Sequence, residues 1–313
     1  RLLILLDELP PYFQSAKSVQ VGNSDLAQVT ATALSNLLVA IGRPGCERVA
    51  LVITDLAATY REGSAQIAEV LHDLENETGR TAMSLEPVRL NSDELYHILR
   101  TRLFEKVPPE EKIGEVAQAY AEAIRKAKQM DMTSESPEEF AARVMASYPF
   151  HPGIRDLYAR FRENPGFQQT RGLIRLMRLV AANLWATGKA KDKLLIGVHD
   201  VDLNQQQIRA EVGQISSSLG NAIAHDIAAE GSATAELLDA EYDSHDATDA
   251  GKLLLMASLA NVPNAVRGLA IPEIITHLAE PGRDAARLKN VLLPALATQA
   301  WYMHSTRDGK LYV

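Results

Sequence analysis

Apolar positions in the first ninety residues form short continuous runs separated by helical stripes. The runs at 2–6 (LLILL) and 48–54 (RVALVIT) are typical of central parallel strands, whose two faces are both covered. Between them, residues 24–41 show helical spacing, and Ser24 is the expected N-cap. A further helix and a third strand are expected at 64–77 and 83–90. This alternation predicts a parallel α/β sheet.

After residue 92 the pattern is helical almost throughout. Helices are expected at 92–104, 109–130, 137–147, 152–163 and 169–187. A brief strand-like run at 193–198 precedes an acidic segment that predicts two helices separated by turns. The last part predicts helices at 252–260, 271–279 and 284–299 and a hairpin built from 301–304 and 310–313. Three helices followed by a hairpin are the element order of a winged helix.

Composition restricts the classes of protein that fit this pattern. The chain has 313 residues, 46% of them hydrophobic and 23% charged, so a substantial core is expected. Cys46 is the single cysteine, which rules out an internal disulfide framework and favours a reducing, cytoplasmic setting. No apolar run approaches the roughly 18 residues of a membrane span. Because an apolar strand begins at residue 2 without a preceding methionine, we expect a piece of a longer protein.

Charge is unevenly distributed along the chain. The formal net charge is −8, which argues against nucleic acid coating the whole surface. Residues 202–249 hold ten acids and one base, whereas residues 250–313 hold four acids and seven bases, a local net charge of +3. Such asymmetry predicts different roles for the two segments.

The strongest candidate chemistry follows the first strand, where Asp7 and Glu8 stand directly after LLILL. A P-loop ATPase needs a carboxylate at this position to hold Mg²⁺ beside the β- and γ-phosphates, and the next acid polarises the attacking water. Asp7 and Glu8 therefore form a candidate Walker B pair. The alternative is an ordinary strand end that enters a polar loop. One helix later the second strand ends in Thr54 and Asp55, and either is a candidate sensor of the γ-phosphate.

Several passages carry a resemblance to known ATPases. Residues 88–102 are similar to the strand-to-lid passage of origin-recognition and related AAA+ ATPases. A more specific resemblance rests on YPFHP at 148–152, PGFQQTRGLIR at 165–175, LLDEL at 5–9 and AWYMHSTRDGKLYV at 300–313. These passages resemble large bacterial AAA+-type ATPases long classed as a domain of unknown function and found near restriction and phage-defence genes, including the phage-growth-limitation type.

The resemblance implies roles for several arginines. Arg171 or Arg175 would occupy the lid-helix position of the second sensor, and Gly172-x-x-Arg175 has the usual Gly-x-x-Arg form. A guanidinium there suits contact with the γ-phosphate. Weaker candidates for an arginine finger toward a neighbouring subunit are Arg80, Arg100 and Arg102. The chain departs from the family in one respect: it has no Gly-x-x-x-x-Gly-Lys-Ser/Thr loop, so this sequence alone is expected to bind ATP poorly.

The predicted winged helix has candidate contacts to DNA. Its third helix carries Arg283, Arg287 and Lys289, and its wing carries Arg307 and Lys310. Such residues contact phosphates and base edges in DNA-binding winged helices. The alternative is a protein-docking or structural module, because a net charge of +3 is modest. The spacing of histidines and acids predicts no metal site other than Asp7 with Mg²⁺.

The predicted organisation is α/β followed by α. Residues 1–106 are the C-terminal part of a P-loop core, 107–200 a helical lid, 201–249 an acidic linker and 250–313 a winged helix. The predicted function is a homo-oligomeric AAA+-like ATPase that uses ATP and Mg²⁺ in a bacterial defence complex and couples nucleotide state to DNA or partner binding. The alternative is a non-catalytic, DNA-binding scaffold with a degenerate ATPase-like core.

Overall fold

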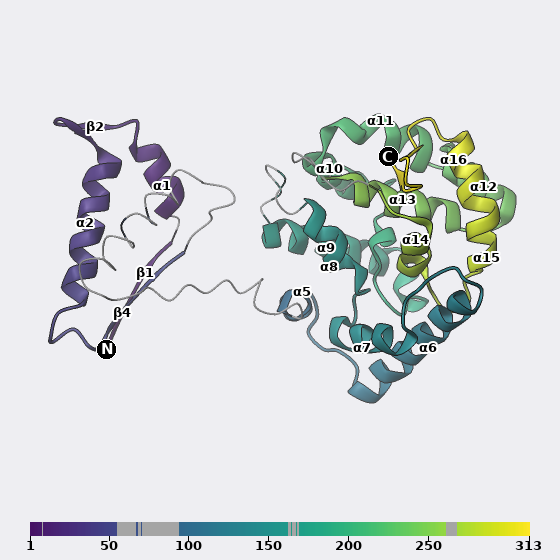
Figure 1. The fold of residues 1–313 in the computed structure, drawn as a ribbon, viewed down its shortest axis with the longest axis horizontal. Helices are drawn as coiled ribbons and strands as arrows, with labels where there is room; N and C mark the ends of the chain where they lie inside the picture. Colours follow the sequence, from purple (N-terminus) through teal and green to yellow (C-terminus); the bar gives the residue numbers. More distant parts are fainter. Residues whose placement is uncertain are drawn as a thin grey trace. The chain divides into compact units, whose positions relative to one another are not determined.

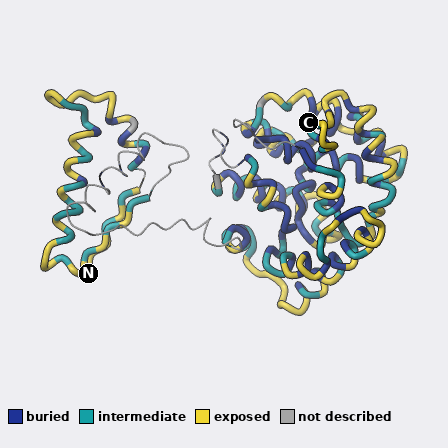
Figure 2. Tube along the Cα trace, in the orientation of Figure 1, coloured by how far each residue is buried: buried dark blue, intermediate teal, exposed yellow. Residues whose placement is uncertain are grey.

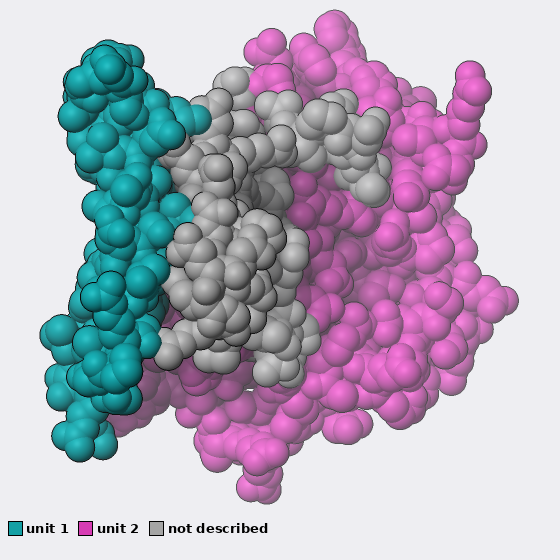
Figure 3. Space-filling view, turned by 60° about the vertical axis from the view of Figure 1, so that its left-hand side comes forward, with its two compact units in different colours: residues 1–86 teal, residues 87–313 magenta. Residues whose placement is uncertain are grey.

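The computed structural model describes residues 1–7, 9–54, 67, 70, 94–161, 164, 167, 169–260 and 268–313. The chain divides into two compact units, residues 1–86 and 87–313, which Figure 3 shows in different colours. The predicted strand at 83–90 lies outside the described residues, as does most of the predicted helix at 64–77. Within the described part, no helix has the length and apolar character needed to cross a membrane.

The first unit is built on two parallel strands. β1 (Leu2–Leu6) pairs with β4 (Val49–Ile53) in a register that places Leu6 beside Ile53. Parallel neighbours need a crossover connection, which is made here mainly by a long helix. The elements between the strands are α1 (Leu9–Ala16), the two short strands β2 (Gln20–Val21) and β3 (Ser24–Asp25), and α2 (Leu26–Ile41) (Figure 1).

Two local details of this unit differ from the sequence-based expectation. Residues 9–16, which lie outside the predicted elements, form a helix; Pro10 and Pro11 lie in its first turn, where no intrahelical N–H donor is required. The cap of α2 is Asp25 instead of Ser24, because the Asp25 carboxylate accepts a hydrogen bond from the Gln28 backbone N–H at 2.8 Å.

β1 is less covered than its apolar sequence predicts. Leu2, Leu3 and Leu5 are 56%, 66% and 60% exposed. Among the described residues β1 pairs with β4 alone, and Leu6 is the β1 residue that packs against the small core of the unit, which includes Phe13. The expectation that both faces of β1 are buried is therefore wrong for this chain.

The second unit is helical. Its first half contains α5 (Glu94–Leu103), α6 (Glu110–Gln129), α7 (Pro137–Ser147), α8 (Gly153–Phe161), α9 (Gln169–Ala186), and the 3-10 helices η1 (Lys189–Lys191) and η2 (Val198–Asp200). The acidic segment forms α10 (Gln206–Ile215), η3 (Ser217–Leu219), α11 (Gly220–Ala222), the π-helical turn η4 (Ile223–Ile227) and α12 (Thr234–Tyr242). The strand expected at 193–198 is reduced to a single bridge between Phe150 and Ile196.

The last part follows the predicted order of elements. It comprises α13 (Asp246–Ser258), α14 (Ile271–Leu278), the continuous helix α15–η5–α16 (Ala285–Arg287, Leu288–Leu292 and Leu293–Gln299), and the hairpin of β5 (His304–Ser305) and β6 (Leu311–Tyr312). The helices and the hairpin are present, while the winged-helix interpretation stays a prediction.

Helix α13 is the centre of the second unit. Eleven of its thirteen residues are buried (Figure 2), and it contacts α8, α12, α14, α16 and β6. The apolar run at 253–257 agrees with this burial on all sides, whereas the buried Asp246 and Asp249 in the first turn are paired with Arg283. One hydrophobic cluster extends from Leu95 to Leu311, so the predicted lid, acidic linker and winged helix share a core. The boundaries expected at 106, 200 and 249 do not coincide with the boundary between compact units at residues 86 and 87.

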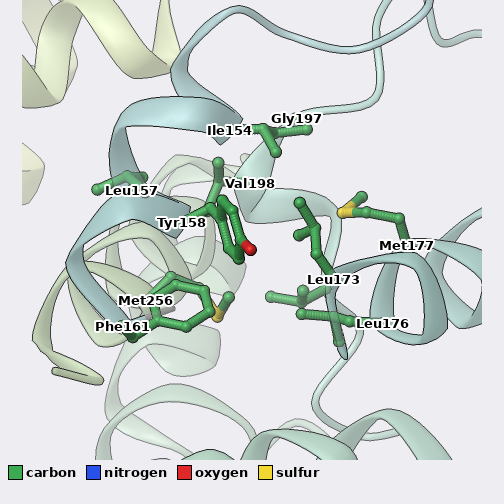
Figure 4. A pocket seen from close by; sticks show the side chains of 11 residues that line it. Ile154, Leu157, Tyr158, Phe161, Leu173, Leu176, Met177, Gly197, Val198 and Met256 are labelled. Carbon is green, nitrogen blue, oxygen red and sulfur yellow. The ribbon is translucent and has the colours of Figure 1, made fainter. Parts of the chain in front are cut away.

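A small internal cavity lies within this core between α8, α9 and α13 (Figure 4). Its volume is about 20 Å³, and apolar side chains such as Leu157, Phe161 and Met256 line it. That volume is close to the space one water molecule needs. The cavity is therefore a packing defect and not a site for a nucleotide.

Candidate functional site

The carboxyl ends of β1 and β4 bring two of the predicted site residues together. Asp7 follows Leu6 and Thr54 follows Ile53, and the Thr54 backbone N–H donates to the Leu6 carbonyl at 3.1 Å. The Thr54 hydroxyl donates a hydrogen bond to Asp7 Oδ1 at 2.6 Å. Residues that are 47 positions apart thus form a polar pair, because parallel strands end at the same edge of a sheet.

The chemistry of this pair fits a hydrated magnesium ion. Mg²⁺ takes oxygen ligands, and in nucleotide sites it uses one or two protein oxygens together with water and phosphate oxygens. Asp7 is exposed and provides carboxylate oxygens, and the Thr54 hydroxyl lies beside them. Among the described residues, no group of three or more histidine, cysteine or acidic side chains is placed to enclose a metal ion. In a nucleotide site, phosphate oxygens and water supply the other ligands of such an ion.

The partners predicted for this pair, Glu8 and Asp55, lie outside the described residues. Of the two candidate sensors, Thr54 is the one that lies within the described residues. Its hydroxyl is oriented by the Asp7 carboxylate, which accepts the hydroxyl hydrogen and leaves the Thr54 oxygen lone pairs to accept from a further donor.

The two candidate arginines of the second sensor lie on α9 in the second unit. Arg175 Nε donates to Glu211 Oε1 at 2.6 Å, and Glu211 is 6% exposed. Arg171 is exposed one helical turn earlier. Arg175 thus stabilises the packing of α9 on α10 through a charge-assisted hydrogen bond, and contact with a phosphate would require it to leave Glu211. Whether either arginine serves as a sensor stays a prediction.

Gly172, the first residue of the predicted Gly-x-x-Arg form, has a packing reason to be glycine. A Cβ at this position would lie 1.8 Å from the carbonyl oxygen of Phe167 and 2.9 Å from its ring. The start of α9 therefore approaches the Phe167 backbone more closely than any side chain allows.

Replacing Gly172 with alanine is expected to lower the free energy of unfolding by roughly 1–3 kcal/mol, because the added methyl group forces the backbone apart. Gly114 in α6 has open space around it, so Gly114→Ala is expected to be neutral or stabilising by up to about 1 kcal/mol. Urea unfolding followed by circular dichroism measures both variants. Equal effects of the two substitutions would contradict the close approach.

Two of the predicted DNA-binding arginines are engaged inside the fold. The Arg283 side chain is 9% exposed, and its Nη2 donates to Asp249 at 2.7 Å and to Glu280 at 3.0 Å. Asp246 lies 3.2 Å from Arg283 Nη1 and also accepts from Arg287 Nη2 at 3.1 Å. Burial disfavours the charge of Arg283, but these carboxylates outweigh that effect and raise its pKa. Both guanidinium groups tie the start of the α15 helix to α13; Arg283 is thereby held inside the fold, whereas the Arg287 side chain is 35% exposed.

The other predicted DNA contacts are more accessible. Arg307 is exposed at the hairpin turn, and Lys289 and Lys310 are half-buried. No salt bridge involving Lys289 or Arg307 is present within the described part of the chain. These three cations and the partly exposed Arg287 remain candidates for contact with phosphates, whereas Arg283 is buried in ion pairs.

The sequence analysis missed an aromatic group beside the hairpin. Trp301 is 73% exposed, and its ring stacks on His225 with centroids 4.6 Å apart. The carboxylate of Asp226, which is 1% exposed, accepts hydrogen bonds from the backbone N–H groups of Trp301 and Tyr302. The 75 positions between Asp226 and Trp301 conceal this contact from any pattern in the sequence.

Three buried histidines form a second unpredicted group. The His151 and His277 rings lie 6.1 Å apart, and His199 is close enough to His151 for charge repulsion. Both ring nitrogens of His199, Nε2 of His151 and Nδ1 of His277 have no hydrogen-bond partner within the described structure. Burial lowers the pKa of all three, that of His277 to about 4. The cluster is therefore neutral near pH 7.

Comparison with known proteins gives one match. Residues 91–240 are similar to a family described as DUF499 second domain, a stretch that begins just before α5 and ends within α12. The match is consistent with a family formerly of unknown function, and it covers the segment predicted as lid and most of the predicted acidic linker. No curated protein and no solved structure matches the chain.

Proposed function

We propose that this chain contributes part of the nucleotide site of an AAA+-type ATPase. The observation that supports the proposal best is the hydrogen bond between Thr54 and Asp7 at the shared edge of two parallel strands. It is the arrangement expected when an acid that organises the metal and a polar sensor follow neighbouring strands. The resemblance of the LLDEL passage to large bacterial AAA+-type ATPases also supports it.

In this proposal each residue has a separate task. Asp7 would hold Mg²⁺, Thr54 would donate or accept a hydrogen bond at the γ-phosphate or the attacking water, and Glu8 would take up a proton from that water as it attacks. A bound Mg²⁺ supplies charge neutralisation of the phosphates. Asp55 is the alternative sensor. Arg171 or Arg175 then links the nucleotide to the helical unit. The proposed setting is a cytoplasmic homo-oligomer of a bacterial defence system, in which a neighbour's arginine completes the site.

ATP hydrolysis by the intact natural protein tests the proposal, with Glu8→Gln as the main variant. We expect this substitution to reduce the hydrolysis rate by roughly a hundredfold while binding of a fluorescent ATP analogue with Mg²⁺ is retained, because the amide cannot accept the proton. Glu47→Gln is the matched control, since Glu47 is an exposed carboxylate near the opposite end of β4. If the intact protein neither binds nor hydrolyses ATP, or if both variants lose activity equally, the proposal is wrong.

The observed element order of α13, α14, α15–α16 and the hairpin favours a second candidate function: a non-catalytic scaffold whose C-terminal part binds DNA. In this case ATP hydrolysis is absent, and binding of nucleic acid does not depend on nucleotide. In this case the buried Arg283 stabilises the fold through its ion pairs, and more exposed cations make the contacts to DNA.

A further inference from the structure

Helix α9 presents arginines and a tryptophan to solvent along one side. Five of its described residues are exposed, and their spacing places them on a single face of the helix. This basic face consists of Arg171, Arg178, Ala182, Trp185 and Ala186. It extends about 21 Å from Arg171 to Trp185, at 1.5 Å per residue. Trp185 is 60% exposed, so a large apolar side chain lies at one end of the face.

The elements packed against α9 extend its positive charge. They are α5, η1 and α10. With α9 they hold two acids, Glu94 and Glu211, and eight bases, Arg100, Arg102, Arg171, Arg175, Arg178, Lys189, Lys191 and Arg209. Asp202 also accepts a hydrogen bond from Asn183 of α9, and the bases still outnumber the acids. Glu211 already pairs with Arg175. Arg171 and Arg178 form no salt bridge with a described residue, so they are available to an acidic partner.

Helix α12 presents the opposite charge together with an apolar side chain. Its exposed residues Leu237, Ala240 and Glu241 lie on one side of the helix, and the exposed Asp243 follows its end. These four residues form the acidic face. Leu237 is 57% exposed. Among the described residues, no cation forms a salt bridge with Glu241 or Asp243.

The elements packed against α12 extend its negative charge. They are η4, α13 and α16. With α12 they hold one lysine, Lys252, no arginine, and six acids, Asp226, Glu236, Asp239, Glu241, Asp246 and Asp249. The four aspartates of this set are buried and accept hydrogen bonds within the fold. Glu236 accepts from backbone N–H groups at the start of its own helix. The acids of the acidic face are therefore the ones that a cationic partner can reach.

The two faces lie on opposite sides of the helical unit (Figure 1). α9 packs on α5 and α10, whereas α12 packs on α13 and α16. One copy of the chain therefore cannot bring its own two faces together, but two copies can. An interface in which one surface meets a different surface of the next copy is heterologous, and it continues from copy to copy into a ring or a filament.

We propose that the basic face of α9 packs on the acidic face of α12 in a second copy of this chain. The arginines meet the carboxylates, Trp185 packs beside Leu237, and the alanines of both faces let the helices approach closely. A second copy is favoured over nucleic acid because the chain itself displays a surface that matches α9 in both charge and apolar character. The inference rests on the homo-oligomer of the proposed function and names its surfaces, and it does not involve the nucleotide site at Asp7.

The mass of the intact protein without ATP, measured by size-exclusion chromatography with light scattering over a range of concentrations, tests the proposal. We expect a wild-type mass above that of one copy, and we expect it to fall as salt is added because salt screens exposed charges. Arg178→Glu and Glu241→Lys are each expected to raise the dissociation constant about tenfold or more, because like charges then face each other across the interface. Arg178 is chosen because Arg171 is also a candidate sensor.

An equimolar mixture of these two variants is the decisive sample. In the mixture, Arg178 of one variant meets Glu241 of the other, and the two substituted side chains also carry opposite charges. We therefore expect the mixture to assemble although neither variant assembles alone. The double variant Arg178→Glu/Glu241→Lys is expected to assemble for the same reason. A mixture that keeps the mass of one copy would overturn the proposal.

Lys126→Glu on α6 is the matched control. Lys126 is exposed, so the substitution makes the same change of charge on another helix and is expected to keep the wild-type mass. The apolar part of the interface is tested at Trp185. Trp185→Ala is expected to weaken assembly about tenfold to a hundredfold, as for a buried aromatic residue at the centre of an interface, and Trp185→Phe is expected to retain most of it.

The same measurements identify the other possible occupants of α9. A wild-type protein with the mass of one copy at every concentration, or equal losses for Arg178→Glu and Lys126→Glu, would contradict the proposal. If Arg178→Glu abolishes binding of a labelled oligonucleotide and leaves the mass unchanged, α9 is a nucleic-acid surface and the proposal is wrong. A single-copy protein with Glu8-dependent ATP hydrolysis overturns this inference alone, whereas assembly through the two faces without such hydrolysis overturns the ATPase proposal alone.

Discussion

Replacing Arg283 with methionine is expected to lower the free energy of unfolding of the helical unit by roughly 3–5 kcal/mol, the loss typical of breaking a buried ion pair from one side. The methionine cannot neutralise Asp249 and Glu280, which accept from the guanidinium at 2.7 and 3.0 Å. Asp249 is the more deeply buried of these two carboxylates. Burial by itself raises its pKa, but His199, Arg283 and Lys252 lower it to about 2, so the carboxylate is ionised in the core.

Two further substitutions show whether burial is the cause. Arg178→Met removes an exposed arginine of α9 and is expected to change stability by less than about 0.5 kcal/mol. Arg287→Met is expected to have an intermediate effect, because the Arg287 side chain is 35% exposed and forms an ion pair with Asp246 alone among the described residues. Urea unfolding of the intact protein, followed at the helical circular dichroism signal, gives all three values. A loss for Arg283→Met no larger than that for Arg178→Met would show that the ion cluster does not stabilise the fold.

Acidification from pH 7 to pH 5 is expected to destabilise the helical unit through the buried histidines. The folded-state pKa of His277 is about 4, mainly because burial disfavours its charge, against 6.5 for an ordinary histidine. The unfolded chain therefore takes up a proton below pH 6.5 that the folded chain excludes, and stability falls as the pH falls. The difference corresponds to about 2 kcal/mol at pH 5 for His277 alone. His151 and His199 act in the same direction.

Charged groups around each histidine raise or lower its pKa, in addition to the effect of burial. Asp249 and Asp200 favour the charged form of His199, but its burial, Arg283 and Lys193 prevail. His151 faces Arg143 and the other two histidines, each of which disfavours its charge. Around His277 the acids Asp156 and Glu273 oppose Arg160 and Arg143, and burial is again the largest effect.

The measurement is urea unfolding at pH 7 and at pH 5, with His277→Gln as the variant. We expect a smaller loss of stability on acidification in the variant than in the wild type, even if the variant is less stable at both pH values. His97→Gln removes an exposed histidine of α5 and is expected to keep the wild-type pH dependence. Equal stability of the wild type at the two pH values would contradict a neutral buried cluster. Asp249 contributes in a lower window, because its stabilisation is lost only as the pH falls below about 3.8 toward 2.

Local patterns predicted most of the helices and the order of the last elements. Residues 137–147, for example, begin with Pro137 after the capping Ser136, and the helix has the expected bounds. The sequence patterns gave the wrong residue where two neighbouring residues could both cap the same helix. Ser24 and Asp25 are both good caps, and the backbone course of β3 selected Asp25. A short apolar run also does not reveal which side is covered, as the exposed Leu3 of β1 illustrates.

For the candidate site, the sequence by itself determined which residues follow each strand, and the parallel order of the strands explains why Asp7 and Thr54 meet, a contact that the sequence analysis did not predict. Only the tertiary structure decided which cations are neutralised by ion pairs and which aromatic side chains contact one another. Arg283 is neutralised by acids more than thirty positions away, and Trp301 is stacked on a histidine 76 positions away. The physical reason is range: helix and strand periodicity arises from contacts between near neighbours, whereas burial, ion pairing and stacking depend on which distant segments fold against one another.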